Sequence, residues 1–214
     1  HQWQQQREAE MQARLTSLQA RIQPHFLFNS MNTIASLIAT NPEQAEEAVL
    51  DLSELFRASL RTDDQLIPLN RELELCQRYL AIESLRLGER LQLEWDIQPG
   101  LGQQVIPPLT LQPLVENAIY HGIQPRPEGG VVRVEVSAKD HFVYLLVQNP
   151  APESTERQHQ GNRVALSNTQ ARLQALFGEP AVLKHSRQGN TYTVTLRLPR
   201  RSINTSNRQS RNRP

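Results

Sequence analysis

The sequence predicts an α+β protein, in which a helical hairpin is followed by a sandwich with helices on one face of a mixed sheet. Three observations predict this fold class. Apolar residues recur at helical spacing through residues 1–61,. Residues 91–97 alternate apolar and polar side chains, as a half-buried strand does,. Further strand-like and helix-like runs then follow, and the short links between strands favour antiparallel pairing,.

The composition excludes several classes of protein. The chain has 214 residues, and 38% of them are hydrophobic, which suits an exposed helical arm and a polar tail beside modest domains,. The formal net charge of +1 gives no field that recruits nucleic acid, so no direct nucleic-acid partner is expected,. The single cysteine, Cys76, excludes an internal disulfide and is expected to fill core space,. No apolar run approaches the roughly 20 residues of a membrane span.

Residues 1–40 predict one long helix whose apolar seam changes at a histidine. The seam before it steps by four, three and four residues, as in a two-stranded coiled coil: Met11, Leu15, Leu18 and Ile22,. Pro24 is expected to kink the helix, and the same count then gives a polar row that begins at His25,. A new apolar row takes over on the other side: Leu27, Met31, Ile34 and Ile38,. Taken alone, this stretch favours a structural role for His25, which would cap or loosen a coiled coil.

A second helix is expected from Pro42 to about Arg61. Asn41 can cap it, and Pro42 fits its first turn,. Its apolar stripe consists of Ala45, Ala48, Val49, Leu52, Leu55, Phe56 and Leu60,. Two amphipathic helices have too little core to stand alone, so we expect a dimer that forms a four-helix bundle.

Periodicity and punctuation by glycine and proline predict the remaining elements. We expect a helix over 71–87, a strand over 91–97, and a helix from Pro107 to Tyr120 that Gly122 ends,. Two strands (131–138 and 142–148), a polar loop (149–162), a helix (164–177) and a strand pair (182–186 and 191–198) complete the fold,. The tail from Pro199 carries five arginines and no acid, and it is expected to be disordered,.

The helix before Gly122 carries a polar cluster. Its buried stripe is expected to consist of Leu111, Leu114, Val115, Ala118 and Ile119,. Glu116, Asn117, Tyr120 and His121 fall on the other side, and residues four apart are neighbours there,. Carboxylate and amide oxygens suit Mg²⁺, and an imidazole can donate a hydrogen bond to a phosphate oxygen. The spacing alone favours an ordinary polar, solvent-facing surface.

Several motifs together resemble a known family. In order they are Pro24-His25-Phe26-Leu27-Phe28-Asn29, Tyr79-Leu80-Ala81-Ile82-Glu83-Ser84-Leu85-Arg86, Ile106-Pro107-Pro108-Leu109, Gln112-Pro113-Leu114-Val115-Glu116-Asn117-Ala118, His121-Gly122 and Asn168-Thr169-Gln170-Ala171-Arg172-Leu173. In this order they are similar to the cytoplasmic part of the LytS-type sensor histidine kinases, over about residues 10–198.

The resemblance implies a domain organisation. Residues 1–62 would form a dimerisation and histidine phosphotransfer hairpin, and 63–89 a connecting helix. Residues 90–198 would form an α/β sandwich, an ATP-binding catalytic domain of the gyrase/Hsp90/histidine-kinase type, before a basic tail over 199–214. The implied partners are a second copy of the chain and a LytTR-type response regulator. Because the first residue is His1 and not Met, we expect a longer protein. This portion would then be the cytoplasmic part of an inner-membrane protein, attached through an upstream region.

The resemblance also implies site residues. His25 would be the phosphorylated histidine, flanked and positioned by Pro24 and Asn29. With ATP and Mg²⁺ as cofactors, Asn117 would bind the metal and Glu116 would be its acidic catalytic neighbour. The implied cofactor-binding set is Asn117, His121, Asn149, Gly161, Arg163, Asn168 and Arg172.

Two glycine-rich boxes depart from the family pattern. The expected adenine box, Asp-x-Gly-x-Gly, reads Asn149-Pro150-Ala151 after Gln148, so an amide replaces the carboxylate that accepts the adenine amino group,. In the second box only Gly161 remains, and Arg163 adds a charge. The residue after His25 is Phe26, which is not an acid. These departures support an alternative: a degenerate kinase that acts as a dimeric regulator-binding module or phosphatase with little ATP turnover.

Overall fold

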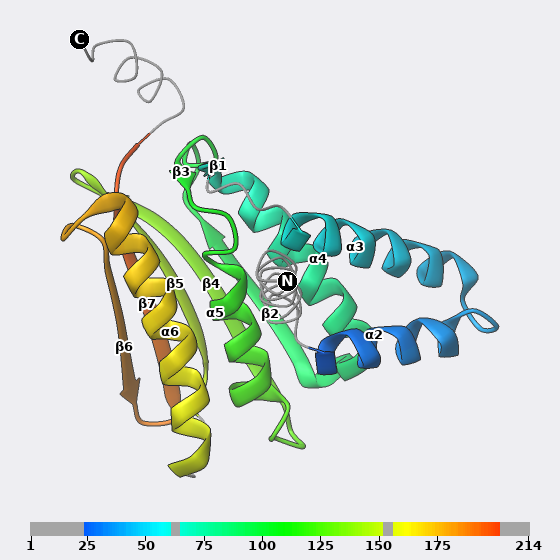
Figure 1. The fold of residues 1–214 in the computed structure, drawn as a ribbon. Helices are drawn as coiled ribbons and strands as arrows, with labels where there is room; N and C mark the ends of the chain where they lie inside the picture. The colour runs from blue at the N-terminus through cyan, green and yellow to red at the C-terminus, as the bar shows by residue number, and fades with distance from the viewer. Residues whose placement is uncertain (1–23, 61–64, 152–155, 202–214) are drawn as a thin grey trace, which may run out of the picture. The chain divides into compact units, whose positions relative to one another are not determined.

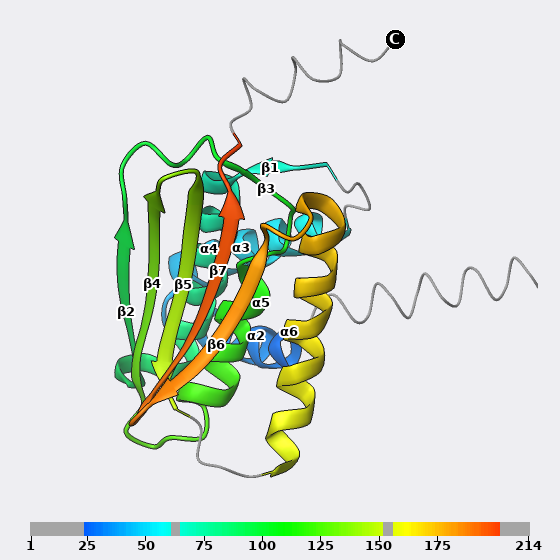
Figure 2. The same ribbon diagram turned by 90° about the vertical axis from the view of Figure 1, so that its left-hand side faces the viewer.

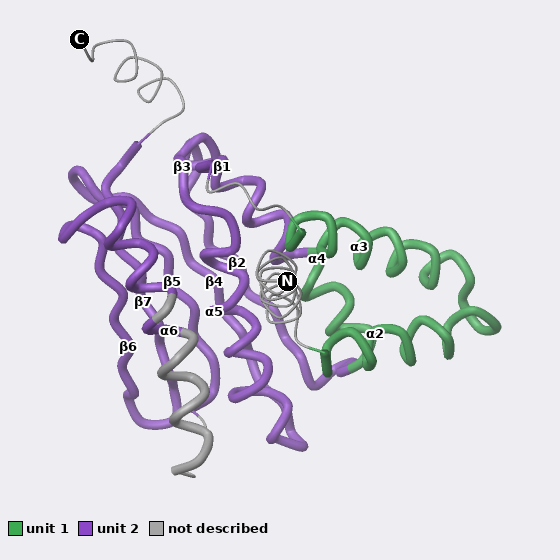
Figure 3. The backbone as a smooth tube through the Cα atoms, viewed as in Figure 1, with its two compact units in different colours: residues 1–63, 78–86 green, residues 64–77, 87–214 purple. Residues whose placement is uncertain are grey.

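A computed structural model describes residues 24–60, 65–151 and 156–201, and for residues 156–165 and 168 it describes the backbone alone (Figure 1). The chain forms two compact units (Figure 3). The first consists of residues 1–63 and 78–86, and the second of residues 64–77 and 87–214. Helix α4 (Leu69–Leu87) contributes to both units. Among the described residues, no helix combines the length and the apolar character that crossing a bilayer requires.

The first unit contains the expected helical hairpin. Helix α2 (Pro24–Leu37) is joined by a tight turn to α3 (Pro42–Leu60), and the two run side by side (Figure 1). The Asn41 side chain caps α3, because its Oδ1 accepts the backbone N–H of Gln44 at 3.2 Å,. The upstream part of the predicted long helix, with its coiled-coil seam, lies outside the described residues.

The face of α2 that is buried differs from the predicted one. The structure buries Phe26, Ser30 and Ile34, whereas Met31 and Ile38 of the predicted apolar row are 57% and 62% exposed. The reason is a partner that the helical pattern does not reveal. Tyr79 of α4 belongs to this unit, and its ring centroid lies 4.7 Å from that of Phe26. The unit thus keeps a second apolar surface outside: Phe28, Met31, Ile38, Val49, Leu50 and Leu60.

The second unit is built on a mixed five-stranded sheet of order β2-β4-β5-β7-β6. Its strands are β2 (Leu91–Ile97), β4 (Gly130–Lys139), β5 (Phe142–Pro150), β6 (Val182–Gln188) and β7 (Thr191–Pro199). Strands β2 and β4 are parallel, with Leu93 opposite Val132, and the other pairs are antiparallel. The parallel pair follows from the long crossover between the two strands, which contains a helix.

Helices cover one face of this sheet, as the sequence predicts (Figure 2). They are α5 (Gln112–Asn117), which continues into the π-helix η2 (Ala118–Ile123), and α6 (Glu156–Phe177). The core lies between them and the inward residues of the central strands. These are Val132, Val134, Val136, Val143, Leu145, Val147, Val194, Leu196 and Leu198. Full burial of each such side chain stabilises the fold by about 1.5–3 kcal/mol.

Several predicted boundaries are wrong. The expected loop over 149–162 is largely structured, because β5 continues through Pro150 and α6 begins at Glu156. Residues 156–163 carry no apolar period, so the sequence pattern gives no helix signal there,. The tail expected from Pro199 is ordered at its start, because the Arg201 N–H donates to Gln104 Oε1 at 3.0 Å. Residues 202–214 lie outside the described part.

The helix expected from Pro107 begins instead at Gln112. Leu109 has a φ of 54°, which a right-handed helix cannot contain, so residues 107–111 form a turn,. Before this turn, the two-residue strands β1 (Ile67–Pro68) and β3 (Val105–Ile106) pair in a small sheet that the sequence does not predict. The turn is held by a side chain from α4. Both oxygens of the buried Glu72 carboxylate accept backbone N–H groups, from Leu109 at 2.9 Å, Leu111 at 2.8 Å and Gln112 at 3.2 Å.

A cation holds the other end of this helix. Arg90 is the last residue of the 3₁₀-helix η1 (Gly88–Arg90), which directly follows α4. Its Nη2 donates to the carbonyl oxygens of Arg126 at 2.6 Å and Gln124 at 3.1 Å. The Arg90 backbone lies against Gly129, whose φ is +70° and where an added Cβ would lie 1.9 Å from the Arg90 carbonyl oxygen. Gly129 therefore permits both the backbone conformation and the approach.

We predict that Gly129→Ala destabilises the protein more than Gly100→Ala. Gly100 also has a positive φ, of +85°, but nothing lies within 4 Å of an added Cβ. Gly100→Ala should cost about 1–2 kcal/mol from the left-handed conformation, and Gly129→Ala a further 1–3 kcal/mol from the clash. Urea unfolding measures both, and equal losses would contradict the steric role of the Arg90 backbone.

We predict that the stability contribution of Glu72 falls as the pH rises. Complete burial raises the pKa of the Glu72 carboxyl above its ordinary value of 4.5, although the backbone N–H groups of Gln112, Leu111 and Leu109 oppose the shift,. Between the ordinary and the raised pKa the folded state binds more protons than the unfolded state, so stability declines with rising pH. The difference in unfolding free energy between wild type and Glu72→Gln should decline as the pH rises above 4.5, the ordinary pKa of the group,. A constant difference in urea titrations would contradict this.

Candidate functional site

His25 lies in the first turn of α2 and is exposed to solvent. Asn29 lies one turn later, and its Nδ2 is 3.1 Å from Nδ1 and 3.3 Å from Nε2 of the imidazole. The amide can donate to whichever of the two ring nitrogens carries the lone pair,. The imidazole is thus accessible and oriented. The kink expected at Pro24 involves residues before it, which lie outside the described part.

An acidic side chain near His25 comes from α4. Glu83 lies one helical turn after Tyr79, the residue that stacks on Phe26, and Glu83 is 2% exposed. Its carboxylate accepts a hydrogen bond from Arg86 Nη2. Burial raises the pKa of the Glu83 carboxyl, and the hydrogen bond and positive charge of Arg86 oppose that shift, with a smaller electrostatic effect of the nearby His25,. An acid was expected only next to His25 in the sequence, whereas the fold places Glu83 of α4 near it.

Glu116 and Asn117 occupy the last turn of α5. Gln112 Nε2 donates to Glu116 Oε1 at 2.9 Å, which fixes that carboxylate one turn from its partner,. Asn117 is half-buried, and within the described ranges its buried Nδ2 atom finds no hydrogen-bond partner. A buried polar atom without a partner is costly and is retained where a ligand completes it. Rotating this terminal amide presents Oδ1 in the same position, an oxygen of the kind that Mg²⁺ accepts.

The structure corrects the prediction that His121 shares an exposed face with Asn117. From Ala118 the helix widens to the π form, so residues four apart no longer lie above one another,. His121 is only 8% exposed, and its ring meets the Tyr120 ring edge-on at 4.8 Å between centroids. Tyr120 is 45% exposed. The imidazole of His121 is therefore packed in the interior and does not lie on a solvent-exposed face of the helix.

Asn149 lies on β5 beneath this helix. It is 5% exposed, and its Nδ2 donates to the Pro150 carbonyl at 2.7 Å, which leaves Oδ1 as the acceptor of the amide,. A Cβ added to Gly122 would lie 2.3 Å from Asn149 Nδ2. Gly122, expected only to stop the helix, thus allows η2 to approach the Asn149 side chain. The fold brings the predicted adenine-side residue next to the helix that carries Asn117.

The other predicted cofactor residues lie on α6. Gly161 and Arg163 fall inside this helix and not in the expected loop, so their backbone N–H groups are engaged in helical hydrogen bonding,. The side chains of Arg163 and Asn168 lie outside the described part. Arg172 Nη2 donates to the Leu109 carbonyl at 2.8 Å and lies 3.2 Å from Thr110 Oγ1. Arg172 thereby joins α6 to the turn that precedes α5.

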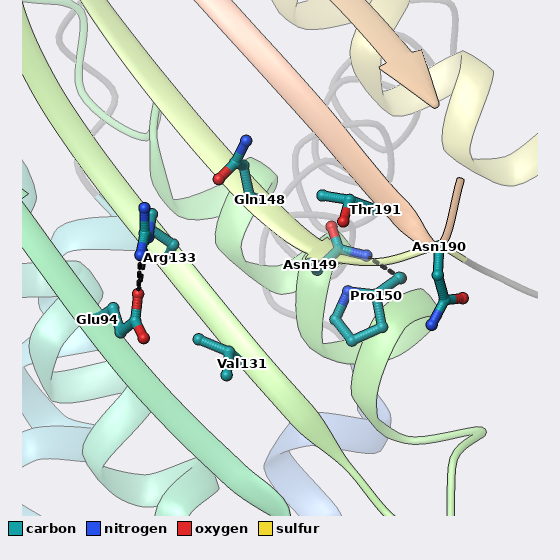
Figure 4. Close-up of a pocket in the computed structure, with 8 residues that line it drawn as sticks. All are labelled: Glu94, Val131, Arg133, Gln148, Asn149, Pro150, Asn190 and Thr191. Atoms are coloured by element: carbon teal, nitrogen blue, oxygen red, sulfur yellow. Dashed lines mark hydrogen bonds and ion pairs between the residues drawn. The ribbon is translucent and has the colours of Figure 1, made fainter. Parts of the chain in front are cut away.

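A pocket lies on the opposite face of the sheet (Figure 4). Its lining residues are Glu94, Val131, Arg133, Gln148, Asn149, Pro150, Asn190 and Thr191. Val131 and Arg133 alternate with Val132 and Val134, whose buried side chains face the helices, so the pocket faces away from the helices,. Glu94 and Arg133 form an ion pair across its floor, and each is about half exposed. Apart from Asn149, no predicted site residue lines this pocket.

Comparisons with known proteins agree with this arrangement. Residues 13–91 match the family model described as histidine kinase. Over 182 residues the chain is 38% identical to the sensor histidine kinase YpdA of Escherichia coli, covering 81% of this chain and 32% of YpdA. Over 189 residues it is 36% identical to the sensor protein LytS of Enterococcus faecalis, covering 80% of this chain and 32% of LytS. The chain spans about a third of the length of these curated relatives.

The fold is also that of solved kinases. The catalytic domain of the histidine kinase ThkA superposes with a TM-score of 0.50 at 11% identity, over 66% of this chain and 99% of that domain. The predicted fold class, a helical hairpin followed by an α/β sandwich with the fold of a histidine-kinase catalytic domain, is thus confirmed. In sequence, the chain is similar to sensor histidine kinases, a LytS protein among them, over about 80% of its own length.

Proposed function

We propose that this chain is the kinase part of a two-component sensor and that it phosphorylates His25 with ATP. The observation that carries the proposal is the exposed imidazole of His25 at the start of a hairpin helix, with Asn29 within hydrogen-bond distance of its ring nitrogens. In this reaction the ring lone pair attacks the γ-phosphorus, the N–P bond forms, and the bond to the β–γ bridging oxygen breaks to release ADP. The phosphoryl group then passes to an aspartate of a response regulator.

The second unit would hold the nucleotide. Asn117 would offer its amide oxygen to Mg²⁺, which neutralises phosphate charge, and Glu116 would hold a water or the metal from the same turn. Asn149 would accept the adenine amino group with Oδ1, because Nδ2 already donates to the Pro150 carbonyl,. His121, Gly161, Arg163 and Asn168 stay proposed contacts on the phosphate side. Arg172 is better placed to support the turn before α5 than to touch the nucleotide.

The proposed function also implies partners for this chain. The exposed apolar residues of the hairpin would form the homodimer interface, and a LytTR-type response regulator would receive the phosphoryl group,. The whole protein would be an inner-membrane sensor with this portion in the cytoplasm. Within the family, the motifs of this sequence resemble most closely those of the alginate and pilus regulatory sensor AlgZ/FimS. The alternative, a degenerate kinase that only binds or dephosphorylates the regulator, is not favoured, because the relatives reported above are sensor kinases.

We predict that incubation with Mg²⁺ and γ-labelled ATP gives acid-labile, base-stable label on the wild-type chain. His25→Gln should carry none, because amide nitrogen is not a nucleophile. His141→Gln is the matched control, since His141 is also exposed but lies in the β4–β5 turn. Label retained on His25→Gln would refute the role of His25. If no variant carries label, the regulator-binding alternative gains ground.

We also predict that Met31→Glu turns a dimer into a monomer. Met31 is 57% exposed within the apolar surface of the hairpin, and a buried unpaired charge at an interface is strongly unfavourable,. Asn32→Glu introduces the same charge one residue away, at an exposed polar position, and should leave the dimer intact. Sedimentation equilibrium distinguishes the two states. A dimeric Met31→Glu protein would place the interface elsewhere.

A further inference from the structure

The helix formed by α5 and η2 is bound at both ends by side chains from one segment of the chain. This helix carries Glu116 and Asn117 and covers Asn149, so its position decides the geometry of the proposed nucleotide site. Glu72 lies near the start of α4, and Arg90 ends η1, which directly follows α4. Neither residue belongs to the set that the resemblance assigns to ATP or to Mg²⁺.

At the N-terminal end the contact is a carboxylate against orphan donors. The first backbone N–H groups of a helix have no intrahelical acceptors, and a negative charge there also complements the helix dipole. Glu72 satisfies the N–H groups of Leu111 and Gln112 with Oε1 and that of Leu109 with Oε2. Because Glu72 is 0% exposed, no water is available to replace it. The start of α5 is therefore fixed to α4.

At the C-terminal end a guanidinium binds the carbonyl of Gln124, the C-cap residue of η2, and that of Arg126 in the following turn, which also accepts the Gly129 N–H. The last carbonyl groups of a helix lack intrahelical donors, and a cation complements the dipole there. Arg90 Nη2 donates to the carbonyls of Gln124 and Arg126, with the Ile123 carbonyl at 3.4 Å. Gly129 then lets the returning chain lie directly on the Arg90 backbone. The end of η2 is therefore fixed to Arg90, the last residue of η1.

Helix α4 also contacts the helical hairpin within the first unit. Arg78 Nη1 donates to Asp51 Oδ1 of α3 at 2.6 Å, and Tyr79 stacks on Phe26, the residue after His25. Helix α4 runs from Leu69 to Leu87, so Glu72, Arg78 and Tyr79 lie on one helix,.

We propose that Glu72 and Arg90 are positioning residues for the nucleotide: they fix both ends of the helix that carries Asn117, and nucleotide affinity depends on them although neither touches the ligand. This inference rests on the proposed function, because it assumes that Asn117 binds Mg²⁺ with ATP. Residues that hold a metal ligand in place typically affect affinity on the order of 10–100-fold when they are changed. The loss should be specific to the metal-bound nucleotide, since the Asn117 amide is what moves.

The test compares ATP binding by calorimetry for the wild-type chain, Glu72→Gln, Arg90→Gln and Arg90→Lys, each with Mg²⁺ and with a chelator. Leu145→Ala is the control for general destabilisation, because Leu145 is a fully buried β5 residue of the same unit. Thermal unfolding confirms that each variant is folded at the temperature used. Asn117→Ala provides the reference for loss of the metal ligand itself.

We expect Glu72→Gln and Arg90→Gln to bind Mg·ATP on the order of tenfold more weakly than wild type. The affinity gain that Mg²⁺ gives should shrink toward that of Asn117→Ala. Arg90→Lys keeps a cationic donor at the helix end, so it should bind more tightly than Arg90→Gln. Leu145→Ala should keep the wild-type affinity while it is folded.

Equal affinities for wild type and both Gln variants would overturn the inference while leaving the proposed function intact. So would losses no larger than that of Leu145→Ala, since these would reflect stability alone. If Glu72→Gln does not fold, the Arg90 pair decides the question, because Arg90 is only half-buried. No ATP binding by the wild-type chain would overturn the proposed function, and the inference with it.

Discussion

The buried carboxylate of Glu72 governs the arrangement of the second unit. Removing a carboxylate from water costs several kcal/mol unless hydrogen bonds replace the hydration, and here three backbone N–H groups do so. Desolvation still dominates, which is why the pKa of Glu72 is raised. In return, the turn at Leu109 can hold its left-handed conformation without leaving helix-start donors unsatisfied,. The position of α5 on the sheet, and hence of Asn117, depends on this contact.

The proposed chemistry is divided between the two units, and each unit prepares its own half. In the first, the buried Phe26 ring packs against Tyr79, while the adjacent His25 stays exposed. The packing of Phe26 thus holds the backbone that carries the proposed nucleophile. In the second, the unpaired amide of Asn117 and the oriented amide of Asn149 lie on the helix-covered side of the sheet. Helix α4 shares residues with both units. Phosphoryl transfer depends mainly on positioning and charge neutralisation, so residues that hold these groups matter as much as the groups themselves.

The structure shows where the residues of the two altered glycine boxes lie. Asn149 replaces a charged acceptor with a neutral one, but the hydrogen bond to Pro150 orients its oxygen, and Gly122 gives the side chain room. Gly161 lies within α6, where its N–H serves the helix. Approach of that backbone to phosphate would therefore require the first turns of α6 to unwind. In the proposed site, nucleotide recognition would therefore depend mainly on residues of α5 and β5.

The sequence by itself determined the local elements and the identity of the chemical groups. Alternation predicted β2, the cap at Asn41 predicted the start of α3, and the ordered motifs predicted the kinase resemblance with His25 and Asn117, because these signals are local in the chain. Tertiary structure decided which apolar row of α2 is buried, since Tyr79 lies far along the sequence from Phe26. It also decided where α5 begins, and it placed Glu83 near His25 and Glu72 and Arg90 at the two ends of α5–η2. Such contacts join residues distant in sequence, and no periodicity encodes the burial and hydrogen bonding that they create.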